Sequence, residues 1–483
     1  MLLKHLINFS QKAPNKIAYI SENKTLTFKE TIEYIEQVAI FLKGKGCKRN
    51  SKIIISADNS LEWVFFYFAI QYIHSIPVIL GKFFSRKYIQ SIIRENKIKF
   101  IITDKKTNQN FLKNTVNITT DEIRKKEFLK KNFSNILNYC NTSSSSTSEI
   151  LFTSGSTSKP KGVILTKKNS FYIAKQISKF VKVKINHKEL LLLPLSHSFG
   201  LGRLKSQIIT GNSLIILKNM NNIGKFLLSI KQYKANGFGI VPSTLEMIKR
   251  IDISFLKEIK TFLRFIELGS EEINIKTVKW LLKSFPNTNI YHHYGMTEAS
   301  RAIFLKYNKD NIKNNLIGNP SFYSKISILN KKKTICKLNE IGEIAIKGPF
   351  VMKGYINNKS INKFTNYGFL TGDYGYKDKK GNVFLLGRKD SLVKINGINI
   401  SLKEIEECIN KYPYIKETLC LLKRNDSQNK IIYAKIVCKK IFKIIDLINF
   451  MQKRIENYKI PEKFEIVKKL PRSESNKLLR TIN

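Results

Sequence analysis

Short apolar strands alternate with helical segments along the first hundred residues. After a strand pair at 17–20 and 25–28, apolar runs predict strands at 52–56, 76–80 and 100–103, with helical patterns at 29–43, 61–72 and 85–96. Gly44 and Gly46 follow the first of these helices, where a helix C-terminus favours glycine. This order is typical of βαβ units, so it predicts an α/β fold with a mostly parallel sheet.

The rest of the chain divides into parts of different pattern. Residues 105–148 are polar and poorly patterned, and we expect an irregular connection there. From about Gly318, short strands with turns predict a small β-barrel-like part. A chain of 483 residues is too long for one ordinary core, so we assign 1–389 to a large domain of βα layers and 390–483 to a small α+β domain. The further expected elements are strands at 162–165, 190–195, 213–218, 237–241, 265–268, 417–423 and 431–438, and helices at 169–182, 402–412 and 444–456.

The net charge is +49, from 85 Lys and Arg against 36 Asp and Glu. Such a balance is found in proteins that bind nucleic acid or anionic membranes. Here the basic residues are spread along the whole chain without an aromatic-interleaved basic motif, so we expect no nucleic-acid partner. The charge instead favours attraction of polyanionic small molecules.

Cysteine usage and hydropathy bear on location. The six cysteines include no C-x-x-C pair, so neither a zinc site nor a disulfide framework is indicated, and a reducing cytoplasm is expected. Residues 1–9 form a short amphipathic stretch, and we expect no signal peptide. The apolar stretch 61–80 is interrupted by Glu62, His74 and Pro77, which favours a buried helix followed by a strand over a transmembrane segment.

Residues 151–166, LFTSGSTSKPKGVILT, pack hydroxyl side chains around a glycine and follow them with two lysines. Small side chains let backbone N–H groups approach a ligand, and hydroxyl and ammonium groups add donors and positive charge, which suits a polyphosphate. It is not a Walker loop, because Pro160 and Lys161 stand where a G-K-[ST] ending is needed. A flexible Ser/Thr linker is the alternative, but the paired lysines and the strand that follows favour a phosphate-binding loop.

A second polar segment, SHSFGLG, follows the strand expected at 190–195. Its His197 could be catalytic, line a pocket or be a hydrogen-bonded core residue, and the lack of a base or metal partner nearby in sequence favours the last two. Arg203, just beyond, could pair with a second substrate carboxylate or with phosphate, but a solvated surface position is favoured.

Residues 292–300, HHYGMTEAS, place a ring, a glycine, a hydroxyl and a carboxylate close together. A ring can stack on a base, and a lone carboxylate beside phosphates indicates Mg²⁺. The alternative for Glu298 is a carboxylate at a helix N-terminus. Further on, Asp373 in a T-G-D turn and Arg388 in G-R-K-D would form a natural pair for a ribose diol and a phosphate, although Asp and Gly are common in any turn.

These motifs, in this order, resemble the adenylate-forming superfamily: acyl-CoA synthetases, the adenylation domains of peptide synthetases, and luciferases. Over nearly the whole chain, FTSGSTSKPKG is similar to the family's phosphate loop, YGMTE to its central signature, TGD to its ribose-binding turn, GRKDSLVKINGINI to its hinge segment and LPRSESNKLLR to its C-terminal lysine motif. The resemblance implies ATP-dependent activation of a carboxylic acid to acyl-AMP with release of pyrophosphate, then transfer of the acyl group to a thiol. We therefore expect an AMP-forming acid–thiol ligase, a carboxylate–CoA ligase, that uses ATP, Mg²⁺ and CoA.

The resemblance also implies roles for individual residues. Thr297 would contact the α-phosphate, Glu298 would bind Mg²⁺, and the catalytic Lys477 would bridge the carboxylate and the α-phosphate. Asp390 would be the hinge of a mobile C-terminal domain, whose rotation brings Lys394 and Gly397 to the site for the thiol step. His197 would line the substrate pocket. The implied ATP-binding residues are Thr153, Ser154, Gly155, Ser156, Thr157 and Lys161 at the phosphates, Gly269, Ser270, Glu271, Tyr294 and Gly295 around adenine, and Asp373 and Arg388 at the ribose.

The chain departs from the family's motifs at two positions, and the resemblance leaves the substrate and the acceptor open. Ser158 and Asn476 stand where the family usually has glycine, so a catalytically weak ATP-binding homologue is an alternative. SHSFGLG lacks the Asp that amino-acid-activating relatives usually carry there, which favours a carboxylate without an α-amine. With no appended carrier domain expected, the acceptor is free CoA or the phosphopantetheine arm of a separate acyl carrier protein.

Overall fold

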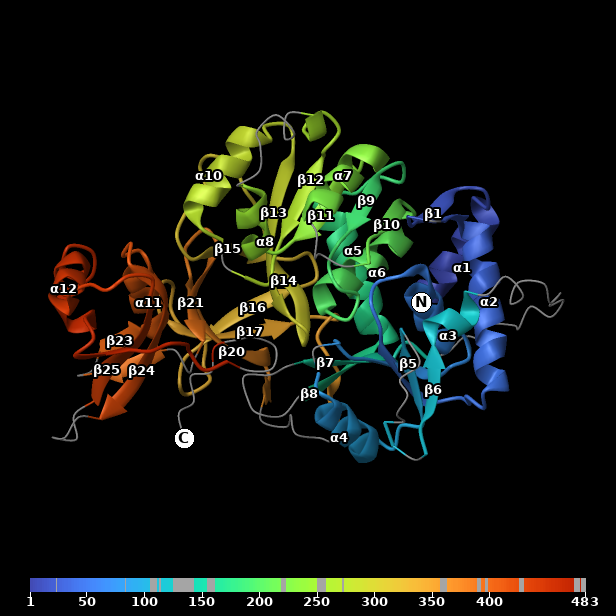
Figure 1. Ribbon diagram of the computed structural model, residues 1–483, viewed down its shortest axis with the longest axis horizontal. Coiled ribbons are helices and arrows are strands. Elements are labelled where there is room, and N and C mark those ends of the chain that lie inside the picture. Colours follow the sequence, from blue (N-terminus) through green and yellow to red (C-terminus); the bar gives the residue numbers. More distant parts are fainter. Residues whose placement is uncertain are drawn as a thin grey trace.

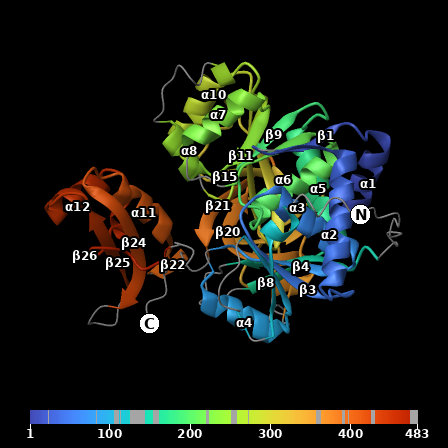
Figure 2. The same cartoon turned by 45° about the vertical axis from the view of Figure 1, so that its right-hand side comes forward.

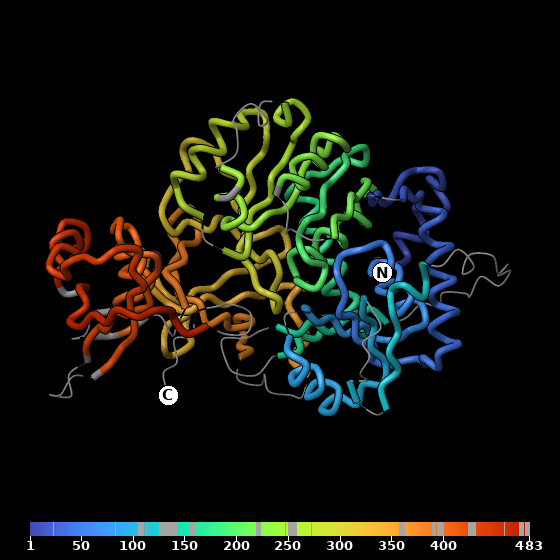
Figure 3. The backbone as a smooth tube through the Cα atoms, viewed as in Figure 1, coloured from blue at the N-terminus to red at the C-terminus, as the bar shows by residue number. Residues whose placement is uncertain are grey.

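The protein is described here from a computed structural model. It describes residues 1–22, 24–82, 84–104, 111–112, 114–124, 143–153, 161–218, 223–249, 258–271, 273–356, 363–388, 392–395, 398–424, 430–472 and 478. Two large mixed sheets with helices on their faces make up most of the molecule (Figure 1). A smaller unit that begins near β22 (Leu392–Ile395) lies at one end of it (Figure 2). Figure 3 shows that the helices of the N-terminal segment lie at the opposite end.

The first sheet has 14 strands, with neighbours β16-β17-β20-β21-β15-β14-β13-β12-β11-β9-β10-β1-β2, and β19 pairs with β20. Its centre, from β13 to β1, is parallel, as the βα alternation predicts. The short strands expected after Gly318 continue this sheet with antiparallel neighbours. The bounds are β1 Ile17–Ile20, β2 Thr25–Thr27, β9 Lys188–Leu191, β10 Ser213–Ile216, β11 Gly237–Ile240, β12 Phe265–Leu268, β13 Asn289–Met296, β14 Ala299–Lys306, β15 Leu316–Pro320, β16 Lys325–Leu329, β17 Gly342–Lys347, β19 Phe364–Thr365, β20 Gly368–Lys377 and β21 Val383–Arg388.

The second sheet has seven strands in the order β18-β8-β7-β4-β3-β5-β6. Its last strand corrects the expectation of an irregular connection over 105–148, because β6 and the short 3-10 helix η1 (Thr120–Ile123) lie in that stretch. Four residues of β6 pair in parallel with β5, and this tertiary pairing stabilises a run too short to predict from its own pattern. The bounds are β3 Lys52–Ser56, β4 Ile76–Ile79, β5 Phe100–Thr103, β6 Val116–Thr119, β7 Thr147–Thr153, β8 Lys161–Thr166 and β18 Gly354–Tyr355.

Helices fill the space between the two sheets and cover their outer faces. Neighbouring strand residues point to opposite faces, so in β3 Ile53 and Ile55 pack into the core between the sheets while Ile54 packs under α4. In β9, Leu191 packs into the central core between the sheets. Its neighbour Leu190 packs into the outer core with α7, α8 and α10. The helices of these layers are α1 Leu2–Lys12, α2 Phe28–Gly44, α3 Leu61–Tyr72, α4 Arg86–Asn96, α5 Lys167–Val181, α6 Ser198–Thr210, α7 Ile223–Tyr233, α8 Pro242–Ile248 and α10 Ile275–Ser284.

The apolar segment that resembled a membrane span is the predicted buried helix and strand. Ser60 caps α3, its side chain accepting a hydrogen bond from the Trp63 backbone N–H, and every residue of the helix except Glu62 is buried. Over the described residues, no helix has the length and apolar character to cross a membrane.

The C-terminal unit has its own core. Val393, Ile405, Ile432 and Leu447 belong to one buried cluster that the strands and helices of this unit share. β24 pairs antiparallel with β25, and β26 joins β25 in parallel. The bounds are β22 Leu392–Ile395, β23 Ile398–Ser401, α11 Leu402–Asn410, β24 Ile415–Arg424, β25 Lys430–Cys438, α12 Ile444–Gln452, the 3-10 helix η5 Asn457–Lys459 and β26 Lys463–Ile466.

Candidate active site

The carboxyl ends of the parallel strands β12 and β13 bring two predicted segments together. Leu268, the last residue of β12, lies beside His292 of β13, so Gly269 and Ser270 follow directly next to the central signature. A Cβ at Gly269 would overlap the His293 imidazole, which explains the glycine. Ser270 has a φ of +68°, a left-handed conformation that side chains disfavour and that is frequent at functional sites.

The signature forms a β-hairpin. Tyr294 and Gly295 lie near the end of β13, whose last residue is Met296, and Thr297 and Glu298 lie in the turn to the antiparallel β14. The alternative of a helix N-terminus at Glu298 is therefore wrong. A Cβ at Gly295 would collide with the Arg301 backbone, so the turn can close this tightly only with glycine.

Tyr355 links this turn to the strand that leaves the phosphate loop. Its hydroxyl donates a 2.6 Å hydrogen bond to the Glu298 carboxylate, and its ring centroid lies 5.9 Å from Lys161 Nζ. Tyr355 occupies β18, which pairs with β8 at Val163. Burial, then the Glu298 charge, raises the pKa of Tyr355, so its hydroxyl keeps its proton at neutral pH. The sequence analysis missed this residue, because it stands 57 positions from its partner.

The pair expected at the ribose is formed across β20 and β21. Arg388 Nη1 lies 3.2 Å from Asp373 Oδ1, and the two residues are cross-strand partners. The Tyr294 hydroxyl donates a 2.5 Å hydrogen bond to the other carboxylate oxygen of Asp373. Burial, then the Asp373 charge, raises the pKa of Tyr294. The two hairpins are therefore tied together at one carboxylate.

Other predicted residues have different surroundings. The Glu271 carboxylate accepts hydrogen bonds from the backbone N–H (2.9 Å) and hydroxyl (3.0 Å) of Ser243 at the start of α8. Thr153 ends β7, opposite Lys161. His197 is exposed at the N-terminal flank of α6, which excludes the core position considered for it. β9 ends at Leu191, short of the strand predicted to 195, and SHSFGLG opens α6.

Several predicted site residues cannot be placed. The side chain of Lys394 is outside the described part, although its backbone belongs to β22. The remaining residues outside the described ranges are Ser154, Gly155, Ser156, Thr157, Ser158, Asp390, Gly397, Asn476 and Lys477.

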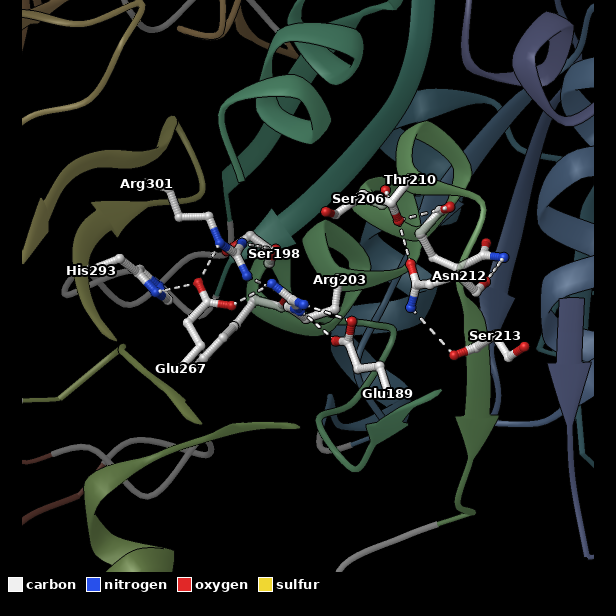
Figure 4. A network of polar contacts seen from close by, with 12 residues as sticks. Glu189, Ser198, Arg203, Ser206, Thr210, Asn212, Ser213, Glu267, His293 and Arg301 are labelled. Carbon is white, nitrogen blue, oxygen red and sulfur yellow. Dashed lines mark hydrogen bonds and ion pairs between the residues drawn. The ribbon is translucent and has the colours of Figure 1, made fainter. Parts of the chain in front are cut away.

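A buried ionic network links the hairpin of β13 and β14 to β9, β12 and α6 (Figure 4). Glu267 of β12 is fully buried, and its carboxylate accepts from Arg203 (3.0 Å) and from Arg301 (3.1 Å), with His293 Nδ1 2.8 Å away. Burial acts to raise the pKa of Glu267, but Arg301 and Arg203 together hold it well below its ordinary value. Arg203 also forms an ion pair with buried Glu189.

This network corrects the solvated position expected for Arg203, which has no exposed surface. Two carboxylates occupy its guanidinium, so it is not available to a substrate carboxylate. Arg301 donates in addition to the carbonyls of Ser198 (3.1 Å) and Phe199 (2.9 Å), and so joins the hairpin to the first turn of α6.

Comparison with known proteins agrees with this geometry. The profile of the family described as "AMP-binding enzyme" matches residues 7–356. The 2-succinylbenzoate–CoA ligase of Bacillus subtilis (strain 168) is 28% identical over 479 residues, which cover 98% of this chain and 96% of that protein. Two solved structures of o-succinylbenzoate CoA synthetase from Bacillus subtilis superpose closely. The complex with the acyl-adenylate OSB-AMP has a TM-score of 0.89 at 26% identity, covering 99% of this chain and 96% of that one. The complex with ATP and magnesium ion has a TM-score of 0.88 at 27% identity, covering 99% and 98%.

The chain belongs to the AMP-binding enzyme family. These relatives confirm the predicted fold class and the prediction of an AMP-forming acid–thiol ligase that activates a carboxylic acid with ATP. They also bear out the expectation of ATP, Mg²⁺ and CoA as cofactors.

Proposed function

We propose that this chain is a 2-succinylbenzoate–CoA ligase. The observation that carries the proposal is the likeness along the full length of the chain to relatives of that name, in Bacillus subtilis and in Listeria monocytogenes. The hairpin geometry supports it. Tyr294, on the hairpin that carries Thr297 and Glu298, donates to Asp373, and Asp373 pairs with Arg388.

The reaction has two steps. A substrate carboxylate oxygen attacks the α-phosphorus of ATP, the bond to the β-phosphate oxygen breaks, and acyl-AMP and pyrophosphate form. The sulfur of CoA then attacks the acyl carbonyl, its proton is lost to solvent, and AMP leaves. Catalysis of the first step needs mainly positioning and charge stabilisation.

The residues of this chain divide these tasks. Glu298 fits Mg²⁺, which takes one or two protein carboxylates together with phosphate oxygens. Asp373 and Arg388 would hold the ribose, and Lys477 would place its charge between the carboxylate and the α-phosphate. Asp390, at the boundary between the proposed domains 1–389 and 390–483, would be the hinge that exchanges Lys477 for the segment of Lys394 and Gly397, a recognised class of switching motion.

The substrate carries two carboxylates, and one must be held away from ATP. Arg203 and Arg301 are excluded from this task because Glu189 and Glu267 occupy them. His197, exposed directly before α6, remains a candidate for the pocket wall.

ATP–pyrophosphate exchange without CoA tests the proposal. We expect exchange with 2-succinylbenzoate and little with benzoate, octanoate or malonate. Lys477→Ala should abolish it, and Lys468→Ala, which removes an exposed lysine after β26, should not. Exchange with one of the other acids alone would refute the substrate, and no exchange with any acid despite ATP binding would favour a catalytically weak homologue.

Adding CoA to the same assay tests the acceptor. Formation of the CoA thioester supports CoA, whereas release of acyl-AMP without thioester would point to a separate acyl carrier protein. We place the enzyme in the cytoplasm, which suits Cys47, Cys408 and Cys420, all buried and none of them in a disulfide.

A further inference from the structure

A basic cavity lies where β12 and β13 of the large sheet begin, at the opposite end of these strands from the candidate active site. It has a volume of about 570 Å³, within the usual range of ligand pockets. Arg264 and Phe265 enter it at the start of β12, and Tyr291 from the first half of β13. The carboxyl ends of the same two strands carry Gly269 and Tyr294, so the cavity and the hairpin are at opposite ends of these strands.

The charged lining of the cavity has one sign. No Asp or Glu is among the described residues that line it. In the described part of the chain, none of its cations forms an ion pair with a carboxylate. Like charges gathered around a concave surface repel one another and raise the local concentration of anions. The cations are Lys179, Lys182, Lys184, Arg264 and Lys306.

The high net charge of the chain does not by itself account for this lining. A second cavity, at the start of α8, is lined by Glu246 and Glu271 as well as by Lys249 and Lys276. The two cavities therefore differ in charge composition within one protein.

Aromatic rings form part of the wall. Phe322 is 54% exposed at the cavity, and Lys179 Nζ lies 4.2 Å from its ring centroid. Tyr291 and Phe265 are buried behind it, and Tyr291 is the cross-strand partner of Lys306. An exposed ring beside ammonium groups suits a ligand with both a flat apolar face and negative charge.

The pKa of His187 reflects the positive charge of the cavity lining. Burial, then the charges of Lys184 and Arg264, lowers its pKa. Its Nδ1 accepts a hydrogen bond from the Lys184 backbone N–H at 3.3 Å, so the proton of the neutral ring is on Nε2.

We propose that this cavity is a binding site for an aromatic phosphate, separate from the adenylation site. Several cations that form no ion pair with a described carboxylate favour a multiply charged group over a single carboxylate. The exposed Phe322 ring provides a surface for a planar ring. The proposal does not depend on which acid the enzyme activates.

Calorimetric titration with 4-bromophenyl phosphate tests the site. Each titration of the full chain is run without and with ATP and Mg²⁺, because ATP fills the adenylation site but, as a flat ring that carries phosphates, also competes for the proposed one. Lys184→Ala/Lys306→Ala removes two exposed charges from the lining and should weaken binding about tenfold. The matched control is Lys331→Ala/Lys332→Ala, which removes two exposed charges from the turn after β16 and should change binding less than about twofold.

A third variant separates the ring from the charge. Phe322→Ala should weaken 4-bromophenyl phosphate about fivefold and leave inorganic phosphate unchanged. Thermal melting of each variant confirms that it is folded. Equal weakening by both lysine pairs, no measurable binding to the native chain, or bromine density outside the cavity in a crystal of the complex would each overturn the proposal.

Discussion

Tyr355 donates its hydroxyl to the Glu298 carboxylate at 2.6 Å, and so couples the strand beside the phosphate loop to the turn of the central hairpin. The bond fixes one oxygen of the only carboxylate in that turn. Glu298 is also held through its backbone, since its carbonyl accepts from the Met352 N–H at 2.8 Å. Both contacts come from the short segment that includes β18.

Removing this hydroxyl should impair the first reaction step. A hydrogen bond to a charged group contributes about 1.5–3 kcal/mol, so Tyr355→Phe should lower kcat/KM for ATP at limiting Mg²⁺ about tenfold or more. Tyr72→Phe is a matched control, because Tyr72 makes a similar bond of 3.0 Å to Glu36 between α2 and α3. Pyrophosphate exchange against Mg²⁺ concentration measures both. Native kinetics in Tyr355→Phe would show that Glu298 needs no such support.

Asp373 ties two hairpins together and is expected to bind the ribose. Asp373→Asn weakens the contacts with both Arg388 and Tyr294, so it should raise KM for ATP about tenfold or more while changing KM for the acid little. Asp378→Asn, in the turn between β20 and β21, serves as the control for hairpin stability. If the two variants raise KM for ATP equally, the effect of Asp373 is structural and the ribose role is wrong.

Much of the fold could be predicted because residues close in sequence determine where its helices begin and end. Ser60 caps α3 through its own side chain, and Gly46, with a φ of +90°, follows α2 where the helical pattern stops. Pro194 shows how a run of leucines misleads. A strand was predicted to residue 195, but proline has no N–H for a ladder hydrogen bond, and β9 ends at Leu191.

The site was harder to predict because its contacts connect distant segments. Arg203 lies 14 residues from Glu189 and 64 from Glu267, and no local pattern links the three. A lone arginine on a helix is usually solvated, so only the tertiary arrangement shows that it is buried. The motif HHYGMTEAS identified the hairpin residues but not the positive φ of +56° at Arg301 just beyond it.

Loss of Arg203 should strongly destabilise the part of the fold that contains the 14-stranded sheet. Arg203→Met leaves the buried Glu189 carboxylate without its arginine and takes one of two arginines from Glu267, which costs about 3–5 kcal/mol. Adding Glu189→Gln should recover part of this loss, because it removes the carboxylate that Arg203→Met leaves unpaired. Urea unfolding can be followed by the fluorescence of Trp63 and Trp280, which both lie in the part that contains Arg203.

The control for this series is Arg124→Met. Arg124 is half exposed and pairs with Glu62 at 3.0 Å and with Asp121 at 2.9 Å. A surface pair of this kind contributes at most about 1 kcal/mol. If the Arg203 and Arg124 variants lose the same stability, the buried network contributes no more than a surface ion pair.

His292 should make the fold sensitive to mild acid. Burial, then the charge of His293, lowers the pKa of His292 to about 4. Its ring nitrogens lie 3.1 Å from the Tyr307 hydroxyl and 3.2 Å from the Glu271 carbonyl, an arrangement that suits the neutral ring with its proton on Nε2. The pKa is about 6.5 in an unfolded chain, so the unfolded state binds the proton first as pH falls. The stability that His292 contributes is therefore present above about pH 6.5 and is lost progressively down to about pH 4.

The variant His292→Asn keeps a donor and an acceptor but does not titrate. Between pH 7 and pH 5 the native chain should lose about 2 kcal/mol more unfolding free energy than this variant does. Urea unfolding at the two pH values measures the difference. The contribution of the buried carboxylates to the pH dependence cancels, because both proteins contain them. Equal pH dependence in native protein and His292→Asn would mean that His292 is already charged in the folded state, and that Nε2 and Nδ1 do not have the donor and acceptor roles given above.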